Sequence, residues 1–178
     1  IVGAQWVKVY DEANMSAADL LATGEYQWQV VEKMPELTVK VYSGVDMTAD
    51  GMTMVFSSSQ KTGSYGGADL WITTRDSIEA EWSKPVNLGD AINTDGKEIH
   101  PALTPDGLTL LFTRPGESGW ETWISTRTSV AATWPEPRRF ELDSFFAPDL
   151  LADQRTVLLS PKYIDLAIAR RSSADGPW

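Results

Sequence analysis

The sequence predicts an all-β fold built from β-propeller blades of about four antiparallel strands each. A turn motif recurs at residues 48–51 and 104–107, and a strand-like run follows each copy. Several downstream landmarks recur in the same register, while helical periodicity is weak outside residues 13–22. A repeat of about 40 to 55 residues containing four short strands has the size of one propeller blade.

The turns set the start of each unit. Asp-Gly, at residues 50–51 and 106–107, is a strong hairpin signal, because the type I′ turn needs positive φ. A third copy at residues 151–154 is degenerate, with Gln154 in place of the glycine. In the clearest unit, four strands are expected near residues 97–104, 108–114, 121–127 and 137–142.

Three further landmarks fix the register of the repeat. Each landmark recurs 52 and then 44 residues further along the chain. The first is a residue of the third strand (Trp71, Trp123 and Ala167), the second is an arginine (Arg75, Arg127 and Arg171), and the third is a tryptophan (Trp82, Trp134 and Trp178). The recurring tryptophans are expected to pack the blades. The arginines are expected to bridge neighbouring blades or to cap a strand end.

The whole chain, residues 1–178, is predicted to be a single propeller segment. When the pattern is extended backwards to Trp28, the segment divides into a partial blade (1–28) and three repeat units (29–82, 83–134 and 135–178). Propellers typically close with four to eight blades. The segment is therefore expected to be part of a larger propeller, completed by the same chain or by another subunit. The opening at Ile1, without methionine, suggests an excerpt or a mature form.

Composition argues against several classes of partner. The chain has 25 acidic and 15 basic residues, for a formal charge of -10, which disfavours nucleic acid and anionic membrane surfaces. The absence of cysteine excludes disulfides and thiolate metal sites. No run of 18 apolar residues is present, so membrane insertion is not expected.

A few polar residues are candidates for chemistry. His100 is the only histidine, and it is either a single general base near Glu98 or a polar residue of an innermost strand. Asp90, Asp95 and Glu98 could supply oxygen ligands to Ca²⁺, but a solvated turn explains them equally well. The acidic pairs at 11–12 and 79/81 likewise suit a glycosidase or an ordinary acidic surface. No cofactor and no metal are expected.

Two glycine-containing loops, residues 63–67 and 116–120, occupy equivalent places between the second and third strands of their units. A phosphate-binding loop would need a following helix and usually a lysine, whereas strands follow here. The aromatic residues Tyr65 and Trp120 could stack on a sugar or anchor a protein partner, and turn packing is the alternative.

Four runs carry a resemblance to a known family: Thr-Ala-Asp-Gly (48–51), Gly-Gly-Ala-Asp-Leu-Trp (66–71), Trp-Ser-Lys-Pro-Val-Asn-Leu-Gly (82–89) and Thr-Pro-Asp-Gly-Leu-Thr-Leu-Leu-Phe (104–112). They resemble the TolB-like (WD40-like, PD40) β-propeller repeats of bacteria. The likeness is clear over residues 41–142. The third unit departs from the pattern at Gln154 and Ala167.

The resemblance implies a periplasmic or extracellular setting in the bacterial envelope. It is specific for a fold and nearly silent on function. The expected function is a non-catalytic recognition or scaffold module that binds a protein or glycan. The alternative is a propeller enzyme, a carbohydrate hydrolase or lyase, with acidic residues and His100 in the central funnel.

Overall fold

The computed structural model describes residues 40–117, 119–142, 145–151, 153–161 and 166–173. The chain divides into two units, Ile1–Thr38 and Val39–Trp178, and every described residue belongs to the second. The expected helix at 13–22, the partial blade 1–28, Trp28 and Trp178 lie outside the described residues. The described part of the chain contains no helix, and hence none that could cross a membrane.

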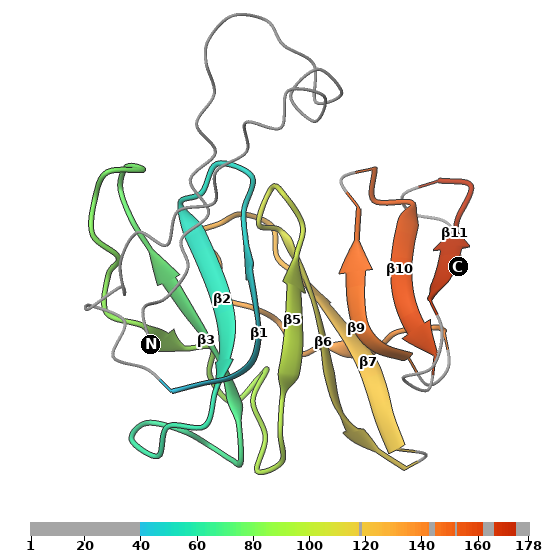
Figure 1. Ribbon diagram of the computed structural model, residues 1–178, viewed down its shortest axis with the longest axis horizontal. Coiled ribbons are helices and arrows are strands. Elements are labelled where there is room, and N and C mark those ends of the chain that lie inside the picture. The colour runs from blue at the N-terminus through green and yellow to red at the C-terminus, as the bar shows by residue number, and fades with distance from the viewer. Residues whose placement is uncertain (1–39, 118, 143–144, 152, 162–165, 174–178) are drawn as a thin grey trace, which may run out of the picture. The chain divides into compact units, whose positions relative to one another are not determined.

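The described residues form three antiparallel sheets (Figure 1). The first sheet consists of β1 (Val41–Met47), β2 (Thr53–Ser58), β3 (Asp69–Thr74) and β4 (Val86–Asn87). The second consists of β5 (Ile99–Leu103), β6 (Thr109–Gly116), β7 (Gly119–Thr126) and β8 (Arg138–Arg139). The third consists of β9 (Phe145–Leu150), β10 (Thr156–Pro161) and β11 (Ala167–Arg170). Within each sheet, every strand pairs with the next one along the chain.

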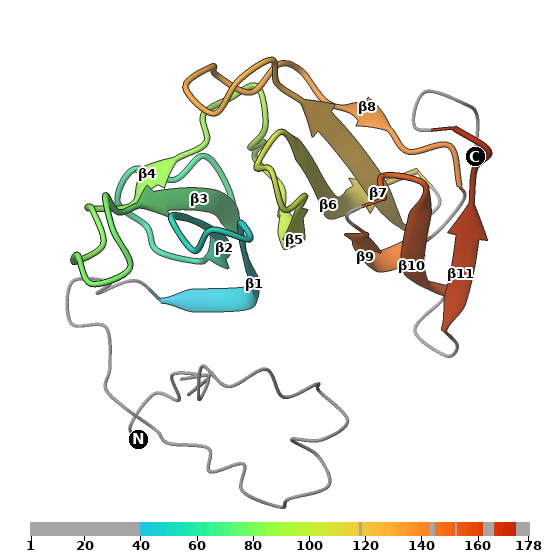
Figure 2. The ribbon, with the colours of Figure 1, turned by 90° about the horizontal axis from the view of Figure 1, so that it is seen from above.

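The three sheets are consecutive propeller blades. The first strand of each sheet is its innermost, and β5 packs beside both β1 and β9. Figure 2 shows the sheets following one another around these inner strands. The all-β, propeller-blade fold class is therefore confirmed, and the four strands expected in the clearest unit are β5 to β8.

The turn between the first two strands repeats atom for atom in the first two blades. Thr48 Oγ1 donates to Asp50 Oδ1 at 2.6 Å, and the amide of Thr53 donates to Thr48 Oγ1 at 3.1 Å. Thr104, Asp106 and Thr109 make the same bonds, at 2.6 and 2.9 Å. The motif Thr-x-Asp-Gly thus closes the hairpin through its side chains as well as through the glycine.

The repeated arginine caps this turn from the end of the third strand of its own blade. Arg75 Nε donates to the carbonyl of Gly51 at 2.8 Å, and Arg127 Nε donates to that of Gly107 at 2.9 Å. Each guanidinium also lies over the ring of the following tryptophan, Trp82 or Trp134, at 4.5 and 4.3 Å. Both tryptophans are buried. Of the two roles expected for the arginine, capping rather than bridging is the one observed.

The third blade keeps this contact although its motif is degenerate. Arg171 Nε donates to the carbonyl of Gln154 at 2.9 Å. Gln154 has φ of 51°, in the left-handed region that its glycine counterparts Gly51 and Gly107 also occupy. A side chain with Cβ is disfavoured there by roughly 1 kcal/mol.

Replacement of Gln154 by glycine is accordingly expected to raise the free energy of unfolding by about 0.5–1 kcal/mol, because it relieves this backbone strain. The lost bond from Gln154 Nε2 to Asp106 (3.2 Å) is exposed and offsets little. Urea denaturation followed by tryptophan fluorescence measures the change. The opposite substitution, Gly107→Ala, is the control and is expected to destabilise, since its Cβ would lie 2.9 Å from Thr48 Cγ2.

The cores lie between the blades rather than within them. Leu110 and Phe112 of β6 are buried against Val55 and Leu70 of the first blade. Leu111, which lies between them, is buried against the third blade instead. Because successive side chains of a strand point to opposite faces, each blade contributes alternate residues to two separate interfaces.

Candidate functional site

Asp69 fixes the loop that follows β2. Its buried carboxylate accepts hydrogen bonds from the amide of Tyr65 at 2.6 Å and from that of Gly66 at 3.0 Å. Asn87 Nδ2 donates to the same carboxylate at 2.7 Å and to the carbonyl of Gly63 at 3.1 Å. One carboxylate at the start of β3 therefore sets the conformation of residues 63–66.

This loop is docked onto the connection that leads into the second blade. Gly67 N donates to the carbonyl of Gly96 at 2.6 Å, and Glu98 N donates to that of Ala68 at 2.7 Å. A Cβ on Gly66 would lie 2.4 Å from the carbonyl oxygen of Thr94, so only glycine permits this approach. The loop of one blade and the entry segment of the next are held as one unit.

The docked loops present a surface that we call the Tyr65 rim, formed by Tyr42, Tyr65, Asp95 and Lys97. Tyr65 is 52% exposed and Tyr42 is 47% exposed, and Asp95 is exposed as well. Lys97 Nζ donates to the Tyr42 hydroxyl at 2.9 Å and lies 4.9 Å from the ring centre. The rim thus combines two accessible aromatic rings with charges of both signs.

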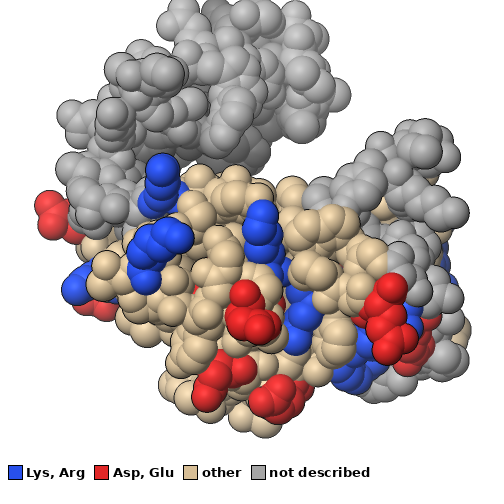
Figure 3. Space-filling view, turned by 90° about the horizontal axis from the view of Figure 1, so that it is seen from below, with Lys and Arg blue, Asp and Glu red and all other residues tan. Residues whose placement is uncertain are grey.

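Figure 3 views the molecule from the side of these loops. Lysine, arginine, aspartate and glutamate side chains are interspersed on this face, and neither sign forms a continuous field. The charges on this face are therefore mixed, although the whole chain has a formal net charge of -10.

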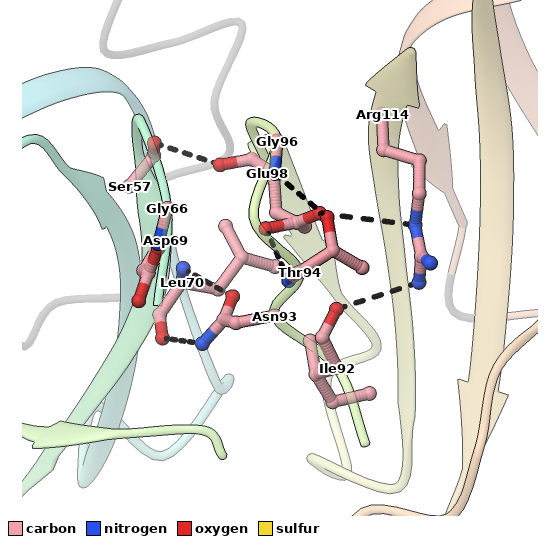
Figure 4. Close-up of polar contacts among 10 residues, drawn as sticks. All are labelled: Ser57, Gly66, Asp69, Leu70, Ile92, Asn93, Thr94, Gly96, Glu98 and Arg114. Carbon is pink, nitrogen blue, oxygen red and sulfur yellow. Dashed lines mark hydrogen bonds and ion pairs between the residues drawn. The ribbon is translucent and has the colours of Figure 1, made fainter. Parts of the chain in front are cut away.

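Glu98 lies beneath the rim and is completely buried between the first two blades (Figure 4). Its carboxylate accepts from Thr94 Oγ1 at 2.6 Å and from the Thr94 amide at 3.1 Å. Arg114 Nε is 4.0 Å away, and the Arg114 guanidinium stacks 4.3 Å from the Trp123 ring. The carboxylate is thus engaged by groups that hold the entry segment in place.

Neighbouring polar groups complete this interface. Asn93 pairs with both backbone groups of Leu70, accepting from its amide at 2.8 Å and donating to its carbonyl at 3.0 Å (Figure 4). Ser57 Oγ donates to the carbonyl of Glu98 at 3.0 Å. These buried bonds link β2 and β3 to the segment before β5 and fix the register of the two blades.

The pKa of Glu98 is raised, chiefly by burial, and the nearby charge of Asp69 adds to this, while the Thr94 bonds and Arg114 oppose it. The pKa of Asp46 is also raised, mainly by burial, although its carboxylate accepts from the amides of Leu103 and Met47. A group with a raised folded-state pKa binds its proton more tightly in the folded state. Its stabilising contribution is full below the unfolded pKa and is lost as pH rises through the folded pKa.

Glu98 is therefore expected to contribute a fall in the free energy of unfolding as pH rises from about 4.5 through its folded pKa. Asp50 and Asp153, whose pKa values are lowered by hydrogen bonds, act in the opposite direction below their ordinary value of 3.8, and His100, whose pKa is lowered by burial, acts in the opposite direction below its ordinary value of 6.5. Denaturant titrations across this pH range measure the slope. Glu98→Gln is expected to flatten it, and an unchanged slope in that variant would assign the pH dependence to other groups.

The sequence-predicted candidates lie in different environments. Asp95 is exposed, Glu98 is fully buried, and His100 is half-buried on β5, where burial lowers its pKa. Among the described residues, no three His, Asp or Glu side chains are grouped closely enough to hold a metal ion. Tyr65 and Asp95 belong to one surface, because Gly66 packs against the backbone of Asp95.

His100 has an unusual backbone. Its φ is 50°, and the pairing of β5 with β6 shifts between Ile99 and Ala102, which marks a bulge. Gly44, at the corresponding place in β1, has φ of 68° and approaches the Cα of His100 so closely that a Cβ there would be 3.0 Å away. The innermost strands thus meet at matching bulges.

Trp120 lies in strand β7 and not in a loop as expected. The β6–β7 ladder continues through the pair Pro115–Trp120 to Gly116–Gly119, so the connection is a tight hairpin. Trp120 is half-buried. The two glycine-containing segments are therefore equivalent in position but different in form, and of their aromatic residues Tyr65 is the more exposed.

Sequence reasoning missed Asp69, Asn87, Asn93 and Arg114. Asp69 had a signal, because it aligns with Glu121 as an acidic landmark of the repeat. Glu121 occupies the same place in the second blade and lies 3.6 Å from Arg139, the counterpart of Asn87 in β8. The recurring acid of the third strand is thus a partner for the fourth strand.

The third blade has a shallow hollow of about 310 Å³, lined by Asp153, Arg155, Thr156, Arg170, Arg171 and Ser172. Much of its polar lining holds the adjacent turn. Asp153 accepts from Thr156 Oγ1 at 2.7 Å and from the Arg155 amide at 2.8 Å, and Arg171 caps Gln154. These polar groups of the lining are therefore already bonded, either within the turn at Asp153 or, for the capping Arg171, to that turn.

Several solved structures are similar to this chain. TolB from Acinetobacter baumannii matches with a TM-score of 0.48 and 14% identity, over 76% of this chain and 31% of that one. Hydrazine synthase from Kuenenia stuttgartiensis matches with 0.43 and 13%, over 73% and 45%. The β-propeller domain of the trilobed protease from Pyrococcus furiosus matches with 0.40 and 12%, over 68% and 34%.

This chain therefore spans less than half the length of each of these three structures. No protein-family model matches the sequence, and no curated protein matches it either. The sheet topology described above identifies the blades, and TolB, whose repeats the sequence motifs resemble, is among the similar structures.

Proposed function

We propose that these blades form a non-catalytic recognition module, and that the Tyr65 rim is its binding surface. The observation that carries the proposal is the combination of an exposed aromatic ring with a rigidly held backbone. Tyr65 is half exposed, yet its own amide is bonded to the buried carboxylate of Asp69. A preorganised aromatic side chain loses little conformational freedom on binding, which favours affinity.

The chemistry of the rim suits an uncharged or mixed-charge partner. Tyrosine offers an apolar ring and a hydroxyl, which serve protein interfaces and sugar stacking alike. The partner is thus a protein or a glycan, and the resemblance of the repeats to bacterial envelope propellers supports a periplasmic or extracellular setting. The carboxylate of Glu98, which a hydrolase would need in the funnel, is bonded instead to Thr94.

The proposal is tested by placing a photo-crosslinking phenylalanine derivative at position 65 and exposing cells that contain the protein to light. The expected result for a protein partner is a discrete crosslinked species. A glycan partner is tested separately, by binding of the purified protein to an oligosaccharide array. The matched control carries the same group at Val130, which is also exposed but follows β7, near the opposite turn at Gly107. Equal crosslinking from both positions, or no binding in either assay, would refute the assignment of this rim.

Tyr65→Ala is expected to weaken binding of the partner found in this way by about tenfold or more, because exposed aromatic anchors dominate such interfaces. Its thermal stability is expected to match that of the parent, since the amide of residue 65 still donates to Asp69. Titration of the purified partner measures the first quantity, and calorimetry the second.

A further inference from the structure

The junction between the first two blades has longer connections than the next junction. Residues 59–68 connect β2 to β3, whereas only residues 117–118 connect β6 to β7. Residues 88–98 connect β4 to β5, whereas residues 140–144 connect β8 to β9. The two longer connections dock on each other and carry most of the Tyr65 rim. The second blade is complete without such insertions, so the docked pair of loops is an addition to the repeat.

A buried ion pair at this junction replaces residues that are uncharged in the other blades. Glu98 and Arg114 stand eight positions before and eight positions after the turn aspartate, Asp106. The other blades have uncharged residues at these two positions: Tyr42 and Ser58 in the first, and Phe145 and Pro161 in the third. A blade of this repeat therefore forms with neutral side chains here, and the charges are a particular feature of the second blade.

The stability of the blades does not account for this pair. Taking two charges out of water carries a large desolvation penalty, and replacing a buried ion pair with apolar residues of similar volume is often neutral or stabilising. Glu98 is fully buried and the Arg114 side chain is 15% exposed. Arg114 Nε is 4.0 Å from the carboxylate, which is the outer limit of an ion pair, so direct attraction recovers only part of the penalty. The contacts of the pair show what else it holds.

The contacts of Glu98 lead to the rim (Figure 4). Its carboxylate accepts from both the hydroxyl and the amide of Thr94, and the Thr94 hydroxyl accepts from the Gly96 amide at 3.1 Å. The Gly96 carbonyl accepts in turn from the amide of Gly67. The absence of a side chain at Gly66 lets the same loop lie against the Thr94 carbonyl. The position of the carboxylate therefore determines how the two loops dock.

Arg114 anchors the other end of this path. Its guanidinium lies 4.3 Å from the Trp123 ring and 5.1 Å from the Phe112 ring, and Nη2 donates to the carbonyl of Ile92 at 3.4 Å. These contacts hold the positive charge on β6, beside both Glu98 and the backbone of the entry segment. The pair thus ties the segment on which the rim rests to a core strand of the second blade.

We propose that Glu98 and Arg114 are positioning residues for the Tyr65 rim, and that they hold the binding surface in one conformation rather than stabilise the blades. This inference rests on the proposed recognition function and adds residues remote from the partner on which affinity depends. Asp69 fixes the conformation within the Tyr65 loop, whereas the ion pair fixes the segment on which that loop lies. Both reduce the conformational freedom that binding would otherwise have to remove.

The first blade supplies the substitution that tests this role. Glu98→Tyr combined with Arg114→Ser installs the residues found at the same positions of the first blade and removes the acceptor of Thr94. The thermal midpoint of unfolding is expected to stay within about 4 °C of the parent. Amide exchange at Gly67 is expected to accelerate by about tenfold or more, because its bonding partner is no longer held. Affinity for the partner of the rim is expected to fall by about tenfold.

Three controls separate positioning from folding. The Gly107 amide, which donates to the Thr104 carbonyl at 2.8 Å in the turn at the opposite end of the second blade, is the matched exchange probe and is expected to be unchanged. Glu98→Gln keeps an acceptor oxygen for Thr94 and is expected to retain slow exchange at Gly67 and most of the affinity. Glu98→Met combined with Arg114→Met also lacks the acceptor, and it provides the same test if the first double variant does not fold.

Exchange at Gly67 is measured without a partner, so its outcome is separate from that of the recognition function. Unchanged exchange at Gly67 in the double variants would overturn the positioning role. Equal acceleration at Gly67 and Gly107 would overturn it as well, because the pair would then stabilise the whole blade, and so would faster exchange with unchanged affinity. Faster exchange at Gly67 alone, with no partner found from position 65, would support the positioning role and refute the recognition function instead.

Discussion

Replacement of Asp69 by alanine is expected to lower the free energy of unfolding by about 3 kcal/mol or more, because three donors lose their acceptor. The carboxylate is fully buried and bonds the amides of Tyr65 and Gly66 as well as the side chain of Asn87. Urea denaturation followed through the eight tryptophans measures the loss. Hydrogen exchange of the Tyr65 amide is expected to accelerate in the same variant.

Two variants give this result a scale. Asp69→Asn keeps one acceptor oxygen but places an amide donor opposite other donors. The free energy of unfolding is therefore expected to fall, but by less than in Asp69→Ala. Asp95→Ala removes an exposed carboxylate from the adjoining loop and is expected to change stability by less than about 0.5 kcal/mol. If Asp69→Ala were as mild as Asp95→Ala, the loop would not depend on the buried carboxylate, and the rigid presentation of Tyr65 would lose its basis.

Phe112→Ala is expected to destabilise the protein by about 3–5 kcal/mol, the usual cost of removing a fully buried aromatic side chain. Phe112 is buried in the core between the first two blades, and the Arg114 guanidinium lies 5.1 Å from its ring. The substitution therefore leaves a cavity at the junction of two blades and removes a ring that faces a half-buried cation. Thermal and denaturant unfolding both report the change.

Phe112→Leu is the graded control, since it retains most of the buried volume and is expected to cost clearly less. Val86→Ala, at an exposed site, is expected to be nearly neutral. Equal losses for Phe112→Leu and Phe112→Ala would show that the ring contacts, rather than the filled volume, determine the stability of this junction.

The fold could be predicted from the sequence because its landmarks are local. The Thr-x-Asp-Gly turn is closed by bonds within six residues, and the arginine and tryptophan recur at fixed distances from it. One strand boundary predicted from these local signals was wrong. The strand that contains Trp120 was expected to begin at residue 121, but the β6–β7 ladder extends to Gly119, because a tight hairpin there lets pairing continue.

The site was less predictable because its bonds connect distant residues. Ser57 and Glu98 are 41 positions apart, and Leu70 and Asn93 are 23 apart. Sequence pattern singled out Glu98 as an acid near His100 but could not show that its carboxylate is buried between blades. It also placed Tyr65 in a glycine loop correctly, without showing that Asp69 holds that loop.

The arginine that caps each turn binds a backbone carbonyl, and every residue type has one. Arg171 therefore makes its bond to Gln154 as Arg75 does to Gly51. A contact of this kind places no demand on the side chain it meets, so the turn can drift during evolution while the arginine stays fixed. In diverged members of such repeats, the arginine would then be a more durable marker of a blade than the Asp-Gly step.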